Sequence, residues 1–78
     1  MSTFSYSDAL TAALDRDPAT AANDAFWIAD ILDRRMRAGR LLQDVIGADK
    51  LAELTHDAEM GRKLADVLKA RADREVRS

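Results

Sequence analysis

The chain has few places at which it can turn, because its 78 residues include three glycines and one proline. Alanine, leucine, arginine and aspartate dominate the composition and β-branched residues are sparse, a mixture that favours helices over strands. The length suits one domain near the lower limit for independent folding. The sequence therefore predicts an all-α fold, a small single-domain bundle of about four helices over residues 1–78.

Three short stretches indicate where helices begin and end. In RDPAT, Asp17 can cap a helix whose first residue is Pro18, since proline lacks the N–H that would be unpaired at that position. In IGADK, Gly47 can adopt the left-handed conformation that closes a helix. In LTHDAE, Thr55 is a candidate N-cap followed by acidic residues in the first turn. These signals predict helices over about 6–15, 18–38, 40–54 and 56–74. Gly39 is a weaker break, through which the second and third helices can run together with a bend.

Two apolar stripes predict the core. Residues of the second helix recur at helical spacing on one side: Pro18, Ala22, Ala25, Ala29, Leu32 and Met36. The alanines of this stripe allow another helix to approach closely. The last helix carries Met60, Leu64, Val67 and Leu68 at the spacing of one buried face, with Ala58, Ala65 and Ala72 along its flank. The expected core is completed by Phe4, Leu10, Leu14, Leu41, Leu42, Val45, Ile46, Leu51 and Leu54.

No motif in the chain is typical of an enzyme. Cysteine is absent, which excludes disulfides and thiolate metal sites. The one histidine, His56, lies between Thr55 and Asp57, but adjacent side chains diverge on a helix, so we expect a capping segment with an exposed imidazole. The stretch LDRDPATAAND resembles a calcium loop in composition only, since proline and alanines replace the ligands and central glycine of an EF-hand. We expect no enzyme activity, metal site, cofactor or small-molecule substrate.

The sequence also predicts a soluble, cytoplasmic protein. The opening residues MSTFSYSDAL lack the basic and apolar regions of a signal peptide. No apolar run approaches the roughly 18 residues of a membrane span. An interfacial helix would carry basic residues along its polar face, whereas the second helix begins with aspartates. We therefore expect no contact with a membrane.

Charge is distributed unevenly along the chain. Residues 1–33 contain six aspartates and one arginine, whereas the remainder contains eleven basic and eight acidic residues. The stretch RRMRAGR supplies a basic cluster made of Arg34, Arg35, Arg37 and Arg40. A nucleic-acid-associated regulator that uses this cluster is the alternative function. However, a helix-turn-helix alignment of residues 39–58 would place the acidic stretch ADKLAELTHD against phosphates. Arg34 and Arg37 also follow aspartates by four residues, so surface ion pairs are expected as well.

The only tryptophan, Trp27, lies on the side of its helix opposite the apolar stripe, with Ile31 one turn further along. Two interpretations are open: the pair covers another helix of the same bundle, or it forms an exposed anchor bordered by charge. Tryptophan and arginine are enriched at binding hot spots, and a short chain gains stability from association. The face predicted to bind a partner consists of Asn23, Trp27, Asp30, Ile31 and Arg34.

The main prediction is a non-enzymatic protein–protein interaction module. It would act as a regulator, adaptor or inhibitor and bind another protein or itself as a homodimer. Small helical accessory proteins of phages and plasmids, such as anti-CRISPR inhibitors and antitoxins, fall in this class, although no motif marks the chain as one of them.

Overall fold

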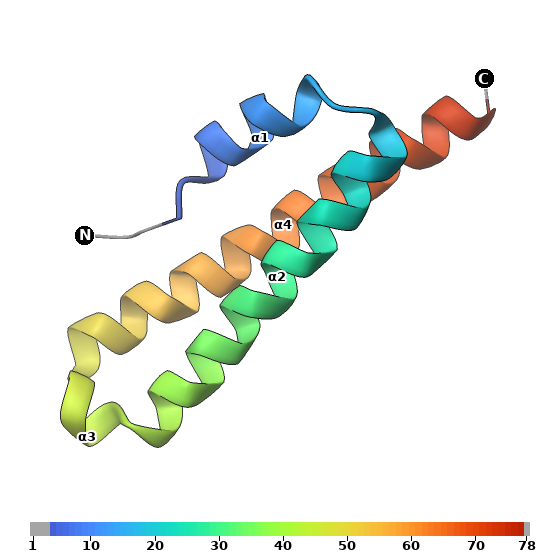
Figure 1. Cartoon of the computed structure of the whole chain (residues 1–78). Helices are drawn as coiled ribbons and strands as arrows, with labels where there is room; N and C mark the ends of the chain where they lie inside the picture. Colours follow the sequence, from blue (N-terminus) through green and yellow to red (C-terminus); the bar gives the residue numbers. More distant parts are fainter. Residues whose placement is uncertain (1–3, 78) are drawn as a thin grey trace.

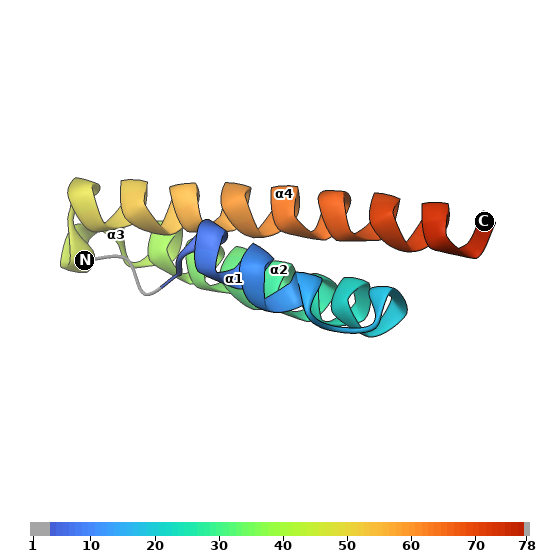
Figure 2. The same cartoon turned by 90° about the horizontal axis from the view of Figure 1, so that it is seen from above.

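The computed structural model describes residues 4–77, which form four helices and no strand (Figure 1). The helices are α1 (Tyr6–Leu14), α2 (Pro18–Leu41), α3 (Gln43–Ile46) and α4 (Ala48–Arg77). The long helices α2 and α4 lie side by side and antiparallel, and α1 packs along one side of this pair (Figures 1 and 2). The Cα trace measures 50 × 19 × 13 Å along its principal axes. The predicted all-α fold is confirmed.

The start of α2 and the end of α3 follow the sequence signals. A carboxylate oxygen of Asp17 accepts a hydrogen bond of 3.2 Å from the backbone N–H of Thr20, and Pro18 is the first residue of the helix. Gly47 ends α3 with a φ of 84°, which favours glycine. Helix α2 continues through Gly39 to Leu41, past the predicted end at residue 38. The second helix is therefore longer than predicted.

The predicted break before residue 56 is wrong, because α4 runs without interruption from Ala48 to Arg77. Thr55 lies inside this helix, where its hydroxyl donates a 2.9 Å hydrogen bond to the carbonyl oxygen of Leu51. The predicted helix over 40–54 is divided among α2, α3 and the start of α4. Residues 48–54 are mostly good helix formers and contain neither glycine nor proline, so a helix that begins after Gly47 continues past Thr55.

The core lies between α2 and α4. Three alanines of α2 pack against two leucines and an alanine of α4: Ala21, Ala22 and Ala25 against Leu64, Ala65 and Leu68. A second cluster contains Leu32, Met36 and Ala58. The helices approach closely where alanines and Gly61 face each other. A Cβ atom at Gly61 would lie 3.3 Å from the Cα of Ala29 and 2.7 Å from a methyl group of Leu32. The predicted alanine-rich contact is confirmed.

Several residues predicted to be in the core are instead exposed, namely Leu14, Leu41, Leu42, Val45 and Val67. Three of them lie where the chain turns from α2 through the four-residue α3 into α4. In the part of the chain that the structure describes, no helix covers the outside of this turn. The sequence predicted them in the core because they are apolar. It did not indicate that the turn lies at one end of the helix pair, outside the core.

Helix α1 is held by contacts with α4. Arg71 donates hydrogen bonds to three backbone carbonyl oxygens at the end of α1 and in the following connection, those of Ala13 (3.3 Å), Leu14 (3.3 Å) and Arg16 (3.5 Å). At the other end of α1, the Nζ atom of Lys63 lies 5.2 Å from the centroid of the Tyr6 ring, within range of a cation–π interaction. Every residue of α1 remains at least partly exposed. Tyr6, Ala9, Leu10 and Ala13 also pack against the core, so the position of α1 depends on this packing as well as on the contacts at its ends.

Candidate functional site

The side of α2 turned away from α4 carries large apolar side chains in contact with solvent. Trp27 is 61% exposed and Ile31 is 52% exposed. Successive residues of a helix are 100° apart around its axis. Trp27 therefore lies on the side of α2 opposite the buried residues Ala25, Leu32 and Met36. The interpretation in which Trp27 is covered within the bundle is therefore wrong. We call this side of α2, defined by Asn23, Trp27, Asp30, Ile31 and Arg34, the outer face.

The polar residues of the outer face surround the two apolar ones. Asn23 lies one turn before Trp27 and is exposed. Asp30 and Arg34 form an ion pair with an N–O distance of 3.1 Å, and 75% of the Arg34 side chain remains exposed. All five residues predicted to bind a partner are thus on the surface and on one side of α2. The outer face combines an apolar centre with hydrogen-bonding groups at its border.

Sequence reasoning missed Phe26, which is also about half exposed. Phe26 is adjacent to Trp27 in the chain and lies at the edge of the buried side of α2. Together, Phe26, Trp27 and Ile31 give α2 three exposed large apolar side chains within six consecutive residues. The pattern of alanines on the buried side could have indicated this, because it leaves the large residues of the segment outside the contact with α4.

A groove of about 460 Å³ lies between α1 and the α2–α4 pair. Five alanines from α1 and α2 line it together with Ile28 of α2 and Leu64 and Leu68 of α4. Arg16 and Asp24, which form an ion pair, and Trp27 lie at the same groove. The sequence could not predict this groove, since it depends on where α1 lies against the other helices.

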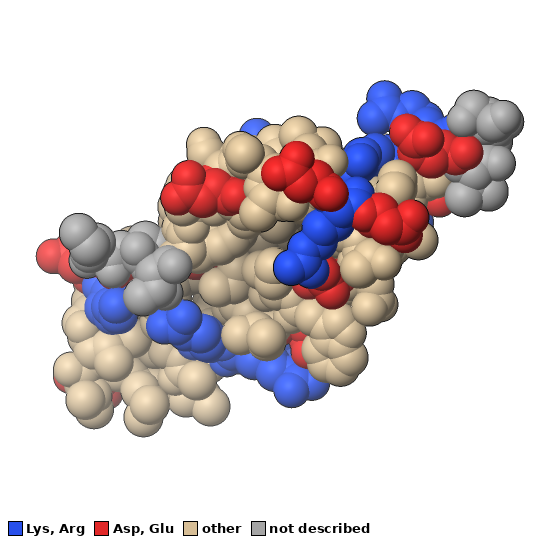
Figure 3. All heavy atoms as spheres, turned by 45° about the horizontal axis from the view of Figure 1, so that its top comes forward, with Lys and Arg blue, Asp and Glu red and all other residues tan. Residues whose placement is uncertain are grey.

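The four arginines of the basic cluster, Arg34, Arg35, Arg37 and Arg40, are all exposed. Arg34 pairs with Asp30 at 3.1 Å and Arg37 pairs with Asp33 at 3.0 Å, so both predicted ion pairs are confirmed. The helical rotation directs the four side chains to different sides of α2. Figure 3 shows acidic and basic side chains interspersed over the face in view. The cluster is thus partly neutralised and is not gathered into one patch.

The remaining candidates for chemistry lie within α4. His56 is exposed and Asp57 is buried, as expected for neighbouring positions of a helix, although neither lies at the helix start that the sequence suggested. Among residues 4–77, no three side chains of histidine, aspartate or glutamate gather closely enough to hold a metal ion. Over the same residues, none of the helices has both the length and the apolar character needed to cross a membrane.

Comparison with protein-family models, with curated proteins and with solved structures finds no match to the chain.

Proposed function

We propose that the chain is a cytoplasmic, non-enzymatic protein that acts as a regulator, adaptor or inhibitor by binding a protein through the outer face of α2. The observation that carries this proposal is the 61% exposure of Trp27 beside the exposed Ile31. A tryptophan buried on binding removes a large area from water, and its indole N–H can still donate a hydrogen bond. An exposed side chain of this kind is a typical anchor of a protein interface.

The surroundings of Trp27 support this proposal. Isolated apolar residues are common on protein surfaces, but neighbouring large ones are typical of interaction sites. Trp27 and Ile31 are one turn apart and therefore adjacent on the helix. The ion pair of Asp30 and Arg34 lies beside them. At this position its polar groups can shield the apolar contact from water and fix the orientation of a bound partner. This arrangement matches the apolar centre and polar border of protein interfaces.

Site-specific photo-crosslinking in the source cells tests the proposal. A photoreactive amino acid in place of Ile31 should give one predominant protein adduct, whereas the same group in place of Glu59, an exposed residue of α4, should not. Combining the Ile31 crosslinker with Trp27→Ala should reduce the adduct about 30-fold at limiting partner concentration, the scale of a hot-spot loss of about 2 kcal/mol. Combining it with Val67→Ala, a partly exposed apolar residue of α4, should leave the adduct unchanged.

The same experiment can overturn the proposal. Absence of a protein adduct from position 31, or an adduct that Trp27→Ala does not reduce, would contradict it. Crosslinks to DNA or RNA would instead favour the nucleic-acid alternative. In that case, replacing Arg34, Arg35, Arg37 and Arg40 with glutamine should remove a salt-dependent mobility shift of nucleic acid.

A further inference from the structure

The outer face continues along α2 as a regular stripe of exposed residues. Trp27, Ile31, Arg34, Ala38 and Leu41 are separated by alternating steps of four and three residues, and all five are exposed. Asp24 precedes Trp27 at the next step of this pattern. The stripe from Asp24 to Leu41 is about 26 Å long at 1.5 Å per residue. Alternating steps of three and four are the spacing by which one helix packs lengthwise against another.

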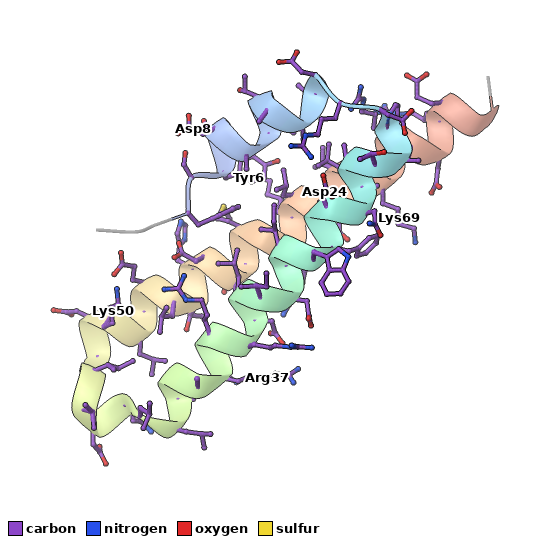
Figure 4. All side chains as sticks on the ribbon, in the orientation of Figure 1. Tyr6, Asp8, Asp24, Arg37, Lys50 and Lys69 are labelled. Carbon is purple, nitrogen blue, oxygen red and sulfur yellow. The ribbon has the colours of Figure 1, made fainter. Side chains whose placement is uncertain are left out.

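Charge along this stripe is divided between its two halves. Before Ile31, the outer side of α2 carries Asp24 and Asp30, and after it the same side carries Arg34 and, toward its edge, Arg37. Asp24 lies in the first half of α2 and Arg37 near its other end (Figure 4). A second α2 in the antiparallel direction would bring each acidic half against a basic half. A parallel copy would bring like charges together, which is unfavourable. The stripe is therefore complementary to itself in the antiparallel direction.

We propose that the partner of the outer face is a second copy of this chain, bound through antiparallel α2 helices related by a two-fold axis. This inference rests on the proposed function of the outer face. In a two-fold arrangement, the register that places Trp27 opposite Ile31 of the second copy also places Asp24 opposite Arg34 of the second copy. Two tryptophans and two isoleucines then form an apolar centre with an ion pair at each end.

The ion pairs of the single chain are compatible with this arrangement. Asp24 pairs with Arg16 and Arg34 pairs with Asp30, yet 41% of the Asp24 side chain and 75% of the Arg34 side chain remain exposed. Exposed pairs of this kind contribute little to stability, so they can exchange for contacts across the interface. The Trp27 indole of each copy, in contrast, would be buried at the interface, whereas it is exposed in the single chain.

Disulfide trapping tests the register, because the natural chain contains no cysteine. We expect purified Asp24→Cys and Arg34→Cys chains to form a disulfide-linked pair under mild oxidation when they are mixed. Either variant alone should remain unlinked, since its two cysteines would be offset by about 15 Å along the helices, whereas a disulfide needs Cα atoms within about 7 Å. Efficient linkage of Asp24→Cys with itself, or no linkage in the mixture, would overturn the proposed arrangement.

Sedimentation equilibrium of the purified chain tests the association itself. The wild-type chain should form a dimer, and Ile31→Asp should raise the dimer Kd by about 30-fold or more, because it places two carboxylates in the apolar centre. Ala70→Asp on the exposed side of α4 should leave Kd unchanged. A wild-type chain that is monomeric at every concentration, while position 31 still crosslinks to a different protein in cells, overturns this inference alone. A monomeric chain without any protein crosslink overturns the proposed function as well.

Discussion

Leu64→Ala should lower the free energy of unfolding by about 2–5 kcal/mol. Leu64 is 1% exposed and packs against the alanines of α2. The methyl groups of these alanines are fixed to the helix backbone and cannot move into the space that the substitution leaves, so a cavity remains. Because a domain of this size has a stability near the lower end of the usual range of about 5–15 kcal/mol, a large fraction of the variant should be unfolded at 37 °C. Urea or thermal unfolding followed by circular dichroism measures this loss.

Val45→Ala is the matched control for this experiment. Val45 is 82% exposed, so removing its methyl groups should change the free energy of unfolding by no more than about 0.5 kcal/mol. Equal losses for the two variants, or an unchanged unfolding midpoint for Leu64→Ala, would contradict the packing of α4 against α2.

Gly61→Leu should destabilise the protein by about 1–3 kcal/mol through overpacking. A Cβ atom at this position would lie 2.7 Å from a methyl group of Leu32 and 3.3 Å from the Cα of Ala29. The side chain of Leu32 can rotate away, but the backbone of Ala29 can move away only if α2 and α4 separate. The gain in helix propensity on replacing a helical glycine, about 1 kcal/mol, offsets only part of this cost.

Ala70→Leu on the same helix provides the comparison. Ala70 is exposed, so the added side chain extends into solvent and the unfolding midpoint should stay close to that of the wild type. A midpoint for Gly61→Leu at or above the wild-type value would show that α2 and α4 are not in close contact at this position.

The elements predicted well from the sequence are those set by local chemistry. Asp17 and Pro18 determine the start of α2 because capping and the missing N–H of proline are properties of neighbouring residues. The alanine stripe of α2 was recognisable because its spacing is that of a helix. Gly47 ended a helix as expected because few other residues tolerate a positive φ.

The elements predicted poorly depend on distant parts of the chain. Thr55 has the chemistry of an N-cap, but the helix formers before it extend α4 through this position. Leu41, Leu42 and Val45 have the composition of a core, yet the core ends before the turn that contains them. The bonds of Arg71 to the end of α1 join residues more than fifty positions apart, and no local pattern predicts such a contact.

The candidate site was found from the sequence because one tryptophan lay among polar neighbours on the helical wheel. Its exposure was not predictable, since a further helix of the bundle could have covered it. The structure removes that alternative, because Trp27 borders the groove beside α1 but remains 61% exposed. The opposed charges of the stripe all lie within the predicted helix over 18–38, but the full length of the stripe was not predicted. Its last exposed apolar residue, Leu41, was expected in a different helix.

Iodide quenching of tryptophan fluorescence is the most direct test of the central claim, that Trp27 is exposed in the free chain and becomes buried on binding. The chain contains one tryptophan, so the emission comes from Trp27 alone. In dilute solution, the emission maximum should match that of indole in water and iodide should quench it readily. At concentrations where the chain associates, or with a bound partner, the maximum should shift to the blue and quenching should fall. A blue, iodide-resistant emission at the lowest concentration, where the chain is monomeric, would contradict the claim and place Trp27 in the core.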